Sequence, residues 1–294
     1  MDASVIGDRV RSSMNELTSA ERKAARILLS AYPIAGLETL ASFAERANVS
    51  APTVMRFVNK LGFEGYPSFQ RALHDEIQER MSSPLTLYDR RPTGDAGGDE
   101  FLSSAHDAFA SSLGTTFARL DGAQLGAAVQ LLAEPRRTVH TTGGRFSQML
   151  AYYLYAHLQQ LRPGTSHIAD GPTPRHDRLT DLGTNDVLAV FDYRRYQPDT
   201  IAFAAEAARQ GTRILLFTDP WISPIADVAD HLLISDVGAP SPYDSIVPAT
   251  ALVETVVVGL INELGDTAQE RVRSVERTRE RFGWHGHQGE HDER

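Results

Sequence analysis

Residues 48–63 read NVSAPTVMRFVNKLGF and carry the start and stop signals of one short helix. Ser50 is a favoured N-cap residue, Pro52 fits the first turn of a helix, and Gly62 fits the position just after its end. These signals predict a helix over residues 51–61. Its apolar side chains recur at helical spacing and form one stripe, which consists of Val54, Phe57, Val58 and Leu61.

A second helix precedes this one after a turn of three residues. Residues 38–47 place apolar side chains on one side of a helix, and residues 48–50 form the turn. Two helices joined in this way, the second one short and capped, are typical of a helix-turn-helix. Apolar residues also recur at helical spacing from residue 17 to 31, and Thr18 with Glu21 forms a capping box at the start of this helix. A further helix is predicted over residues 68–80.

The outer face of the second helix is polar. Its side chains off the apolar stripe are Thr53, Arg56, Asn59 and Lys60. Arginine can read a guanine edge or bind phosphate, threonine can contact a thymine methyl group, and lysine typically contacts phosphate. Ser50 and the free amides at the helix start offer another phosphate site. A DNA-reading helix and an ordinary four-helix domain with a solvated charged face both fit this pattern.

The composition narrows the class of protein. The chain has 294 residues, 41% of them hydrophobic, a net charge of −9 and no cysteine, which excludes disulfides and thiolate catalysis. The first 90 residues are electrically neutral, so the acidic excess lies in the remainder. The N-terminus lacks the apolar core of a secretory signal, and the apolar stretch 249–261 is too short to span a bilayer. We therefore expect a cytoplasmic protein that does not enter the membrane.

The rest of the chain alternates between apolar strands and helices. The predicted strands cover residues 138–142, 166–169, 186–192, 212–218 and 231–235. This alternation predicts a five-stranded, mostly parallel sheet with helices on both faces. The expected fold class is an all-helical domain followed by a parallel α/β sandwich. The expected boundaries are 1–81 for the helical domain, 82–98 for a linker, 99–265 for the α/β domain, and 266–294 for a charged terminal helix and a tail.

Three motifs in the helical domain resemble the RpiR-type transcription regulators. They are LTSAERKAARIL at residues 17–28, LASFA at residues 40–44, and VS-x-x-TV-x-RF-x-x-KLGF-x-GY at residues 49–66. The resemblance implies that this domain binds a double-stranded DNA operator through the second helix and the residues just after it. The candidate DNA contacts are Ser50, Thr53, Arg56, Asn59, Lys60 and Tyr66.

The C-terminal region is similar to the sugar isomerase (SIS) domain that this family joins to its helix-turn-helix. Residues 214–232, ILLFTDPWISPIADVADHL, resemble the signature T-D-x-x-x-SP-x-A-x-x-AD. The similarity covers about residues 100–262 and so, with the helical domain, nearly the whole chain. It implies a SIS-like domain that binds a small effector without a cofactor and assembles the chain into a homodimer or homotetramer.

Ligands of an open parallel sheet bind beyond the carboxyl ends of its strands. The turns there span residues 143–147, 192–198 and 218–223. Gly143 and Gly144 open a helix, whose free amides and dipole favour an anion. The candidate effector-binding residues come from these three turns and are Gly143, Gly144, Arg145, Ser147, Asp192, Tyr193, Arg194, Arg195, Thr218, Asp219 and Ser223.

Two of these turns depart from the family pattern. The first usually reads G-x-G-x-S, and Arg145 replaces its second glycine. The second usually reads S-x-S-G-x-T, and here residues 192–197 read DYRRYQ. Arginine binds carboxylate or phosphate bidentately, and Tyr193 and Tyr196 offer stacking or hydrogen bonds. We expect a small anionic metabolite, which is a sugar phosphate, a sugar acid or another carboxylate. An arginine–aspartate network without a ligand fits the same residues.

Other functions of the C-terminal region stay open. A sugar-phosphate isomerase needs a base, for which Glu254 and His140 are candidates, and a plain oligomerisation domain binds nothing. Residues 241–245 either close over the pocket or cap the last long helix. We favour a regulator over an enzyme, because a DNA-reading domain is an unusual companion for a metabolic enzyme. No catalytic residue and no metal site is expected, including in the glycine-rich tail that contains His285, His287 and His291.

Overall fold

A computed structural model describes residues 6–81, 85 and 98–282 of the chain. The chain divides into two compact units, Met1–Pro92 and Thr93–Arg294. The predicted linker, residues 82–98, falls almost wholly outside the described residues. The tail with His285, His287 and His291 also lies outside them.

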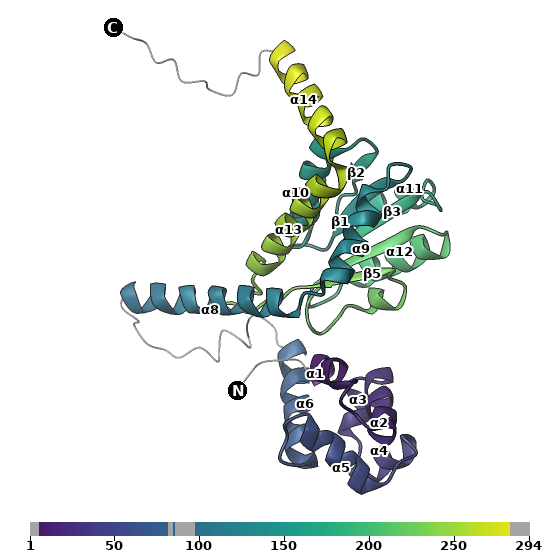
Figure 1. Ribbon diagram of the computed structural model, residues 1–294, viewed down its shortest axis with the longest axis vertical. Helices are drawn as coiled ribbons and strands as arrows, with labels where there is room; N and C mark the ends of the chain where they lie inside the picture. Colours follow the sequence, from purple (N-terminus) through teal and green to yellow (C-terminus); the bar gives the residue numbers. More distant parts are fainter. Residues whose placement is uncertain (1–5, 82–84, 86–97, 283–294) are drawn as a thin grey trace. The chain divides into compact units, whose positions relative to one another are not determined.

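The N-terminal unit consists of helices packed around one apolar core (Figure 1). Its helices are α1 (Ile6–Ser13), α2 (Ser19–Ser30), α3 (Ile34–Leu37), α4 (Leu40–Arg46), α5 (Ala51–Lys60) and α6 (Tyr66–Met81). The capping box predicted at the start of α2 is present: the Thr18 and Glu21 side chains each accept a backbone N–H of the other residue.

Helices α4 and α5 form the predicted helix-turn-helix. Ser50 has the extended backbone of an N-cap residue, and Gly62 has a φ of +86°, which suits glycine just past a helix end. The predicted apolar stripe of α5 is buried in the core, since Val54, Phe57 and Val58 are inaccessible to solvent. The opposite face of α5 is therefore the one that can meet a ligand.

The C-terminal unit contains one parallel sheet of five strands in the order β2-β1-β3-β4-β5. The chain runs from β1 outward to β2 and then crosses back to β3 on the other side of β1. The strand order thus reverses between β1 and β3, which is where open α/β sheets place their binding crevice. The strands are β1 (Thr138–Gly143), β2 (Thr165–His167), β3 (Asp186–Phe191), β4 (Arg213–Thr218) and β5 (His231–Ile234).

Helices cover both faces of this sheet (Figure 1). One face packs on α9 (Gly122–Ala133), α10 (Gln148–Leu161) and α13 (Val247–Leu264), and the other packs on α12 (Pro198–Arg209). The fold class expected from the sequence is confirmed. The remaining elements of this unit are α8 (Gly98–Arg119), α11 (Pro172–Leu179), the short 3-10 helix η1 (Pro224–Asp227) and α14 (Asp266–Arg281).

Helix α13 is long and apolar enough to cross a membrane by length and composition alone. Its buried side chains, among them Leu252, Val256 and Leu260, instead belong to the core that the sheet shares with α9 and α10. Its apolar composition is explained by this packing, because a helix that covers a sheet needs a continuous apolar face.

Candidate functional site

The outer face of α5 carries three exposed polar side chains, which are those of Arg56, Asn59 and Lys60. Ser50, at the start of the helix, is also exposed. The Nη2 atom of Arg56 donates to the Thr53 hydroxyl at 3.2 Å, and that hydroxyl lies 2.9 Å from the hydroxyl of Ser50. The guanidinium has five N–H donors, so this bond leaves others for a base edge or a phosphate.

Thr53 differs from its predicted role. Its side chain is only 6% exposed, because it sits at the border of the apolar stripe and packs inward. Its hydroxyl lies between Ser50 and Arg56 and orients both. Thr53 thus lies beneath the candidate DNA-binding surface, where it stabilises Ser50 and Arg56, and its own side chain is not exposed on that surface.

Lys60 and Tyr66 were also predicted as DNA contacts, and both have intramolecular roles. The Lys60 ammonium lies 2.8 Å from the buried Glu21 carboxylate and donates to the carbonyl of Glu16. Tyr66 is 4% exposed, and its hydroxyl donates to the carbonyls of Gly36 and Glu38. Burial raises the pKa of Tyr66 to about 12. The prediction is wrong for Tyr66, which is a core residue.

The Lys60 ion pair gives the first testable prediction. Burial acts to raise the pKa of Glu21, but hydrogen bonds from Lys60 and Thr18 outweigh it and hold the pKa below its usual value. Lys60→Ala leaves this buried carboxylate without its cation, so we expect the free energy of unfolding to fall by about 1–2 kcal/mol. Urea unfolding followed by circular dichroism measures the change. Lys23→Ala, which removes an exposed lysine from α2, is the control, and an equal loss in both variants contradicts the prediction.

A pocket of about 650 Å³ lies in the C-terminal unit, beside the carboxyl ends of β1 and β3. It is formed by the turn after β1, the turn after β3 and the segment before α13. Seven of the predicted effector residues line it, namely Gly144, Arg145, Ser147, Asp192, Tyr193, Arg194 and Arg195. The pocket also has an apolar wall that no sequence motif predicts, and this wall includes Met149, Val237 and Ile246.

The other four predicted residues lie outside this lining. Gly143 is at the end of β1. Thr218, Asp219 and Ser223 are buried, and their side chains stabilise the turn after β3. Thr218 donates to the carbonyl of Asp192 at 2.7 Å, and Ser223 donates to the Asp192 carboxylate. The sequence predicted that these four residues contact the effector. In the structure they instead support the residues that line the pocket.

Asp219 binds the same turn through its carboxylate. It accepts the Tyr196 hydroxyl at 2.7 Å, the backbone amide of Trp221 at 3.0 Å, and the backbone amide of Arg194. Burial raises the pKa of Asp219, and that of Asp192, to about 6. Burial thus brings the pKa of both carboxyl groups closer to neutral pH than that of an ordinary aspartate.

This gives a prediction for the pH dependence of stability. Because burial raises the pKa of Asp192 in the folded state, its contribution to stability is present below about pH 4 and is lost as the pH rises through about 6. The melting temperature of Asp192→Asn, relative to the natural chain, should therefore rise by about 2–4 °C between about pH 5 and about pH 7. Thermal unfolding at both values tests this. Asp177→Asn, at an exposed position of α11, should show a constant difference, and the same constancy in Asp192→Asn refutes the prediction.

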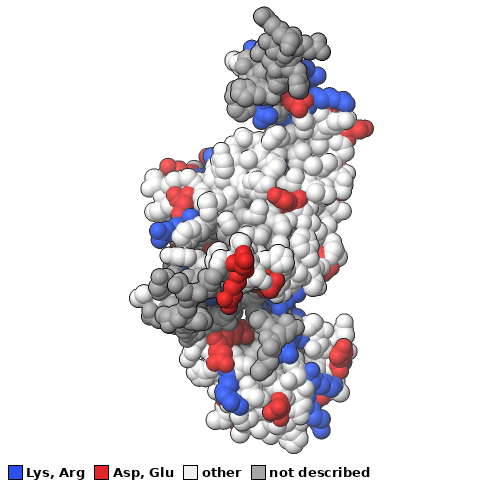
Figure 2. Space-filling model, turned by 90° about the vertical axis from the view of Figure 1, so that its left-hand side faces the viewer, with Lys and Arg blue, Asp and Glu red and all other residues white. Residues whose placement is uncertain are grey.

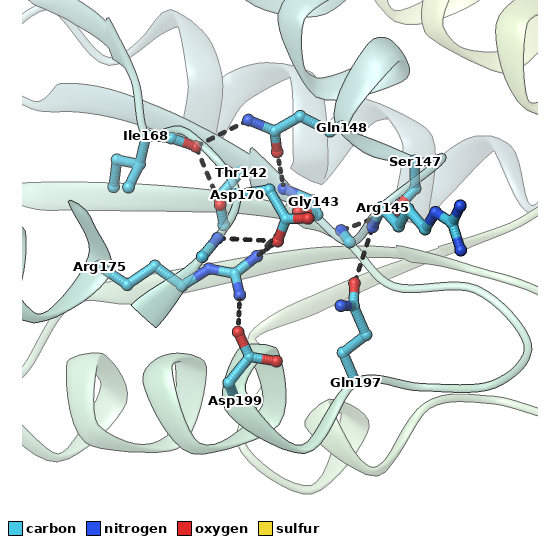
Figure 3. Close-up of polar contacts among 12 residues, drawn as sticks. Thr142, Gly143, Arg145, Ser147, Gln148, Ile168, Asp170, Arg175, Gln197 and Asp199 are labelled. Atoms are coloured by element: carbon cyan, nitrogen blue, oxygen red, sulfur yellow. Dashed lines mark hydrogen bonds and ion pairs between the residues drawn. The ribbon is translucent and has the colours of Figure 1, made fainter. Parts of the chain in front are cut away.

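Three amides of the turn after β1 are bound within the protein, contrary to the sequence expectation of free amides. The amide of Gly143 donates to the Gln148 side chain at 2.9 Å, and that of Gly144 donates to the Ser147 hydroxyl at 2.9 Å. The amide of Arg145 donates to the Gln197 side chain at 2.7 Å (Figure 3). Side chains of the protein thus occupy three of the donors that this turn could offer to an anion.

The three predicted arginines of the pocket differ in their surroundings. Arg194 forms an ion pair with Asp244, has a side chain only 5% exposed, and lies 5.2 Å above the Trp221 ring. Arg145 and Arg195 are exposed, and neither has a carboxylate partner among residues 6–81 and 98–282. The pocket therefore offers two available guanidiniums instead of three.

The segment before α13 contacts the pocket and does not cap the helix through Asp244. Tyr243, Asp244 and Ser245 line the pocket, and α13 begins at Val247. The Ser245 hydroxyl accepts the Val247 amide at 3.1 Å, while Asp244 is bound to Arg194. The geometry therefore favours the alternative in which residues 241–245 lie against the pocket.

Arg175 of α11 was not found from the sequence. It is 1% exposed and donates to the carbonyl of Gly143 at 2.8 Å, to Asp170 at 3.1 Å and to Asp199 (Figure 3). It thereby connects the end of β1 to the starts of α11 and α12. No sequence signal points to it, because its partners come from three separate segments.

The two candidate bases of the isomerase alternative do not line the pocket. His140 lies between Ser166, at 2.6 Å, and Asp186, at 3.2 Å. Glu254 accepts the Tyr153 hydroxyl at 3.0 Å on the side of α13. Among the described residues, no group of three or more histidine, cysteine or acidic side chains is arranged to hold a metal ion.

Comparison with known proteins identifies both units. Residues 6–80 match the rpiR-family helix-turn-helix domain, and residues 131–259 match the SIS domain. The HTH-type transcriptional regulator HexR of Pseudomonas aeruginosa is 25% identical over 252 residues, which cover 85% of each chain.

Two solved structures are also similar to the chain. The sugar isomerase domain of an RpiR transcription factor from Sphaerobacter thermophilus is 26% identical with a TM-score of 0.57, and the match covers 60% of this chain and 99% of that one. NanR of Vibrio vulnificus, solved in complex with ManNAc-6P, shares the fold with a TM-score of 0.54 and 18% identity over 95% of this chain and 99% of its own. With a helix-turn-helix of the rpiR family ahead of a SIS domain, the chain belongs to the RpiR-type transcription regulators.

Proposed function

We propose that this regulator binds its DNA operator through the outer face of α5. The observation that carries the proposal is the exposure of Arg56 and Asn59 on the second helix of the helix-turn-helix, opposite its buried apolar stripe. Both side chains are suited to base edges in a major groove. Ser50, which is exposed at the start of α5, is the proposed phosphate contact.

The pocket at the carboxyl edge of the sheet is the proposed effector site. Arg145 and Arg195 favour an anionic ligand, since each can bind an oxyanion bidentately. NanR, which has the same fold, was solved with a sugar phosphate bound. A small anionic metabolite, whether a sugar phosphate, a sugar acid or another carboxylate, is the proposed effector in the cytoplasm.

Self-association of the C-terminal unit completes the proposal. Large apolar side chains on α10 and α13 are exposed, among them Tyr152 at 58% and Val258 at 58%. Figure 2 shows a face of this unit with few charged side chains. A homodimer, or a homotetramer built from it, would cover such a surface and provide two helix-turn-helix units for two operator half-sites.

Operator binding with and without an effector tests this function. Duplexes selected from random sequence by the full-length chain define an operator, and a thermal-shift screen of metabolites supplies candidate effectors. A true effector should change operator affinity by about 5–150-fold, the usual range of coupling between two sites. A chain that selects no duplex sequence refutes the proposal. Turnover of a sugar phosphate would instead favour the isomerase.

A further inference from the structure

Most polar side chains of the pocket are bound to other groups of the protein. The Ser147 hydroxyl donates to the carbonyl of Phe191 at 2.7 Å, and the Tyr193 hydroxyl lies 2.9 Å from that of Ser235. Asp192 accepts Ser223, and Asp244 accepts Arg194. A polyhydroxylated ligand needs free donors and acceptors along its length, and these groups already have partners.

The same holds for the part of the pocket where a phosphate would bind. A phosphate monoester is usually held by several backbone amides at a helix start. Here Gln197 accepts the Arg145 amide at 2.7 Å, and the neighbouring amides are bound to Ser147 and Gln148. The Gln197 side chain also lies against Gly144, where a Cβ atom would come within 2.2 Å of its Oε1 atom. Intramolecular bonds therefore occupy three of the amide donors that could hold a phosphate.

Two kinds of surface remain available to a ligand. One is cationic and consists of the exposed guanidiniums of Arg145 and Arg195. The other is apolar and is made by Phe146, Met149 and Ile246, which are 53%, 56% and 36% exposed. A guanidinium fork matches a planar carboxylate, and the apolar side chains lose unfavourable contact with water when an apolar group covers them.

We propose that the effector is an amphipathic carboxylate, meaning a carboxylate attached to an aromatic or aliphatic body, and not a phosphosugar. This inference rests on the proposed function, because it assigns the ligand class of that effector pocket. The carboxylate binds Arg195 and Arg145 at the rim, and the apolar body covers Met149, Ile246 and Phe146. The pocket volume of about 650 Å³ lies within the usual range of sites that bind small molecules.

Calorimetric titration of the full-length chain tests the ligand class. The probes are acetate, butanoate, phenylacetate, the neutral phenylacetamide, inorganic phosphate and glucose 6-phosphate. Affinity should increase about fourfold for each methylene added from acetate to butanoate, and phenylacetate should bind at least about tenfold more tightly than phenylacetamide. Tighter binding of glucose 6-phosphate than of every carboxylate overturns the proposal, and so does the absence of carboxylate binding at millimolar concentration.

Matched variants locate the binding. Arg195→Ala should weaken phenylacetate binding by about tenfold or more. Arg136→Ala removes the same charge from an exposed turn before β1, outside the pocket lining, and should leave the affinity unchanged. Equal losses in both variants overturn the proposal, because they indicate a general effect of charge.

The same titrations separate this inference from the proposed function. If glucose 6-phosphate binds and changes operator affinity, the sensing function stands and the carboxylate class is wrong. If phenylacetate binds in the pocket but leaves operator affinity unchanged, the ligand class stands and the sensing function is wrong.

Discussion

Replacing Arg175 by methionine is expected to lower the free energy of unfolding of the C-terminal unit by about 2–4 kcal/mol. Methionine fills the space of the aliphatic stem but leaves the buried carbonyl of Gly143 without its donor. It also leaves Asp170 and Asp199 without their common cation. These two carboxylates are 32% and 38% exposed, so water compensates them in part, and the unpaired carbonyl accounts for much of the loss.

Urea unfolding followed by tryptophan fluorescence measures this effect, since Trp221 lies in the same unit. Arg178→Met is the matched control on the same helix. Arg178 is 38% exposed and lies 3.8 Å from Asp181, so its removal should cost less than about 1 kcal/mol. If the two variants unfold at the same urea concentration, the bonds of Arg175 do not stabilise the fold.

Replacing Arg56 by alanine is expected to weaken operator binding by about 5–150-fold, which corresponds to about 1–3 kcal/mol. The side chain is exposed on α5, and its bond to the Thr53 hydroxyl holds it on the outer face. Loss of this side chain should not disturb the core, because the buried stripe of α5 lies on the other side. Anisotropy of a labelled operator duplex, measured at several salt concentrations, gives the affinity.

The salt series distinguishes two modes of binding by Arg56. If the guanidinium binds a phosphate, Arg56→Ala decreases the slope of log affinity against log salt by about one. If it binds a base edge, the same variant relaxes the sequence preference at one position of the operator. Arg71→Ala, at an exposed position of α6, removes the same charge from the same unit and serves as the control. An equal loss of affinity in both variants means that α5 has no special role in binding.

The sequence predicted those features that depend on near neighbours in the chain. The bounds of α5 follow from Ser50, Pro52 and Gly62, and the structure places the helix over residues 51–60. The alternation of apolar strands and helices likewise predicted the parallel sheet. Capping and periodicity act within a few residues, so they can be read without knowledge of the tertiary structure.

Several of the errors concern side chains whose partners are distant in the sequence. Glu21, which binds Lys60, is 39 residues away, and the carbonyl partners of Tyr66 are about 30 residues away. Similarly, Gln197 binds the amide of Arg145 across 52 residues. A pattern of residue types can show that a side chain is polar, but only the fold shows which partner it has.

Gly143, at the end of β1, has a consequence for the evolution of this pocket. A Cβ atom there would lie 2.8 Å from backbone atoms of Ser147 and Gln148, so no other residue is tolerated without moving the main chain. Arg145 and Arg195, in contrast, are exposed side chains on the same framework. Substitution at Arg145 or Arg195 can therefore change the ligand without moving the main chain, whereas substitution of Gly143 requires the main chain to shift.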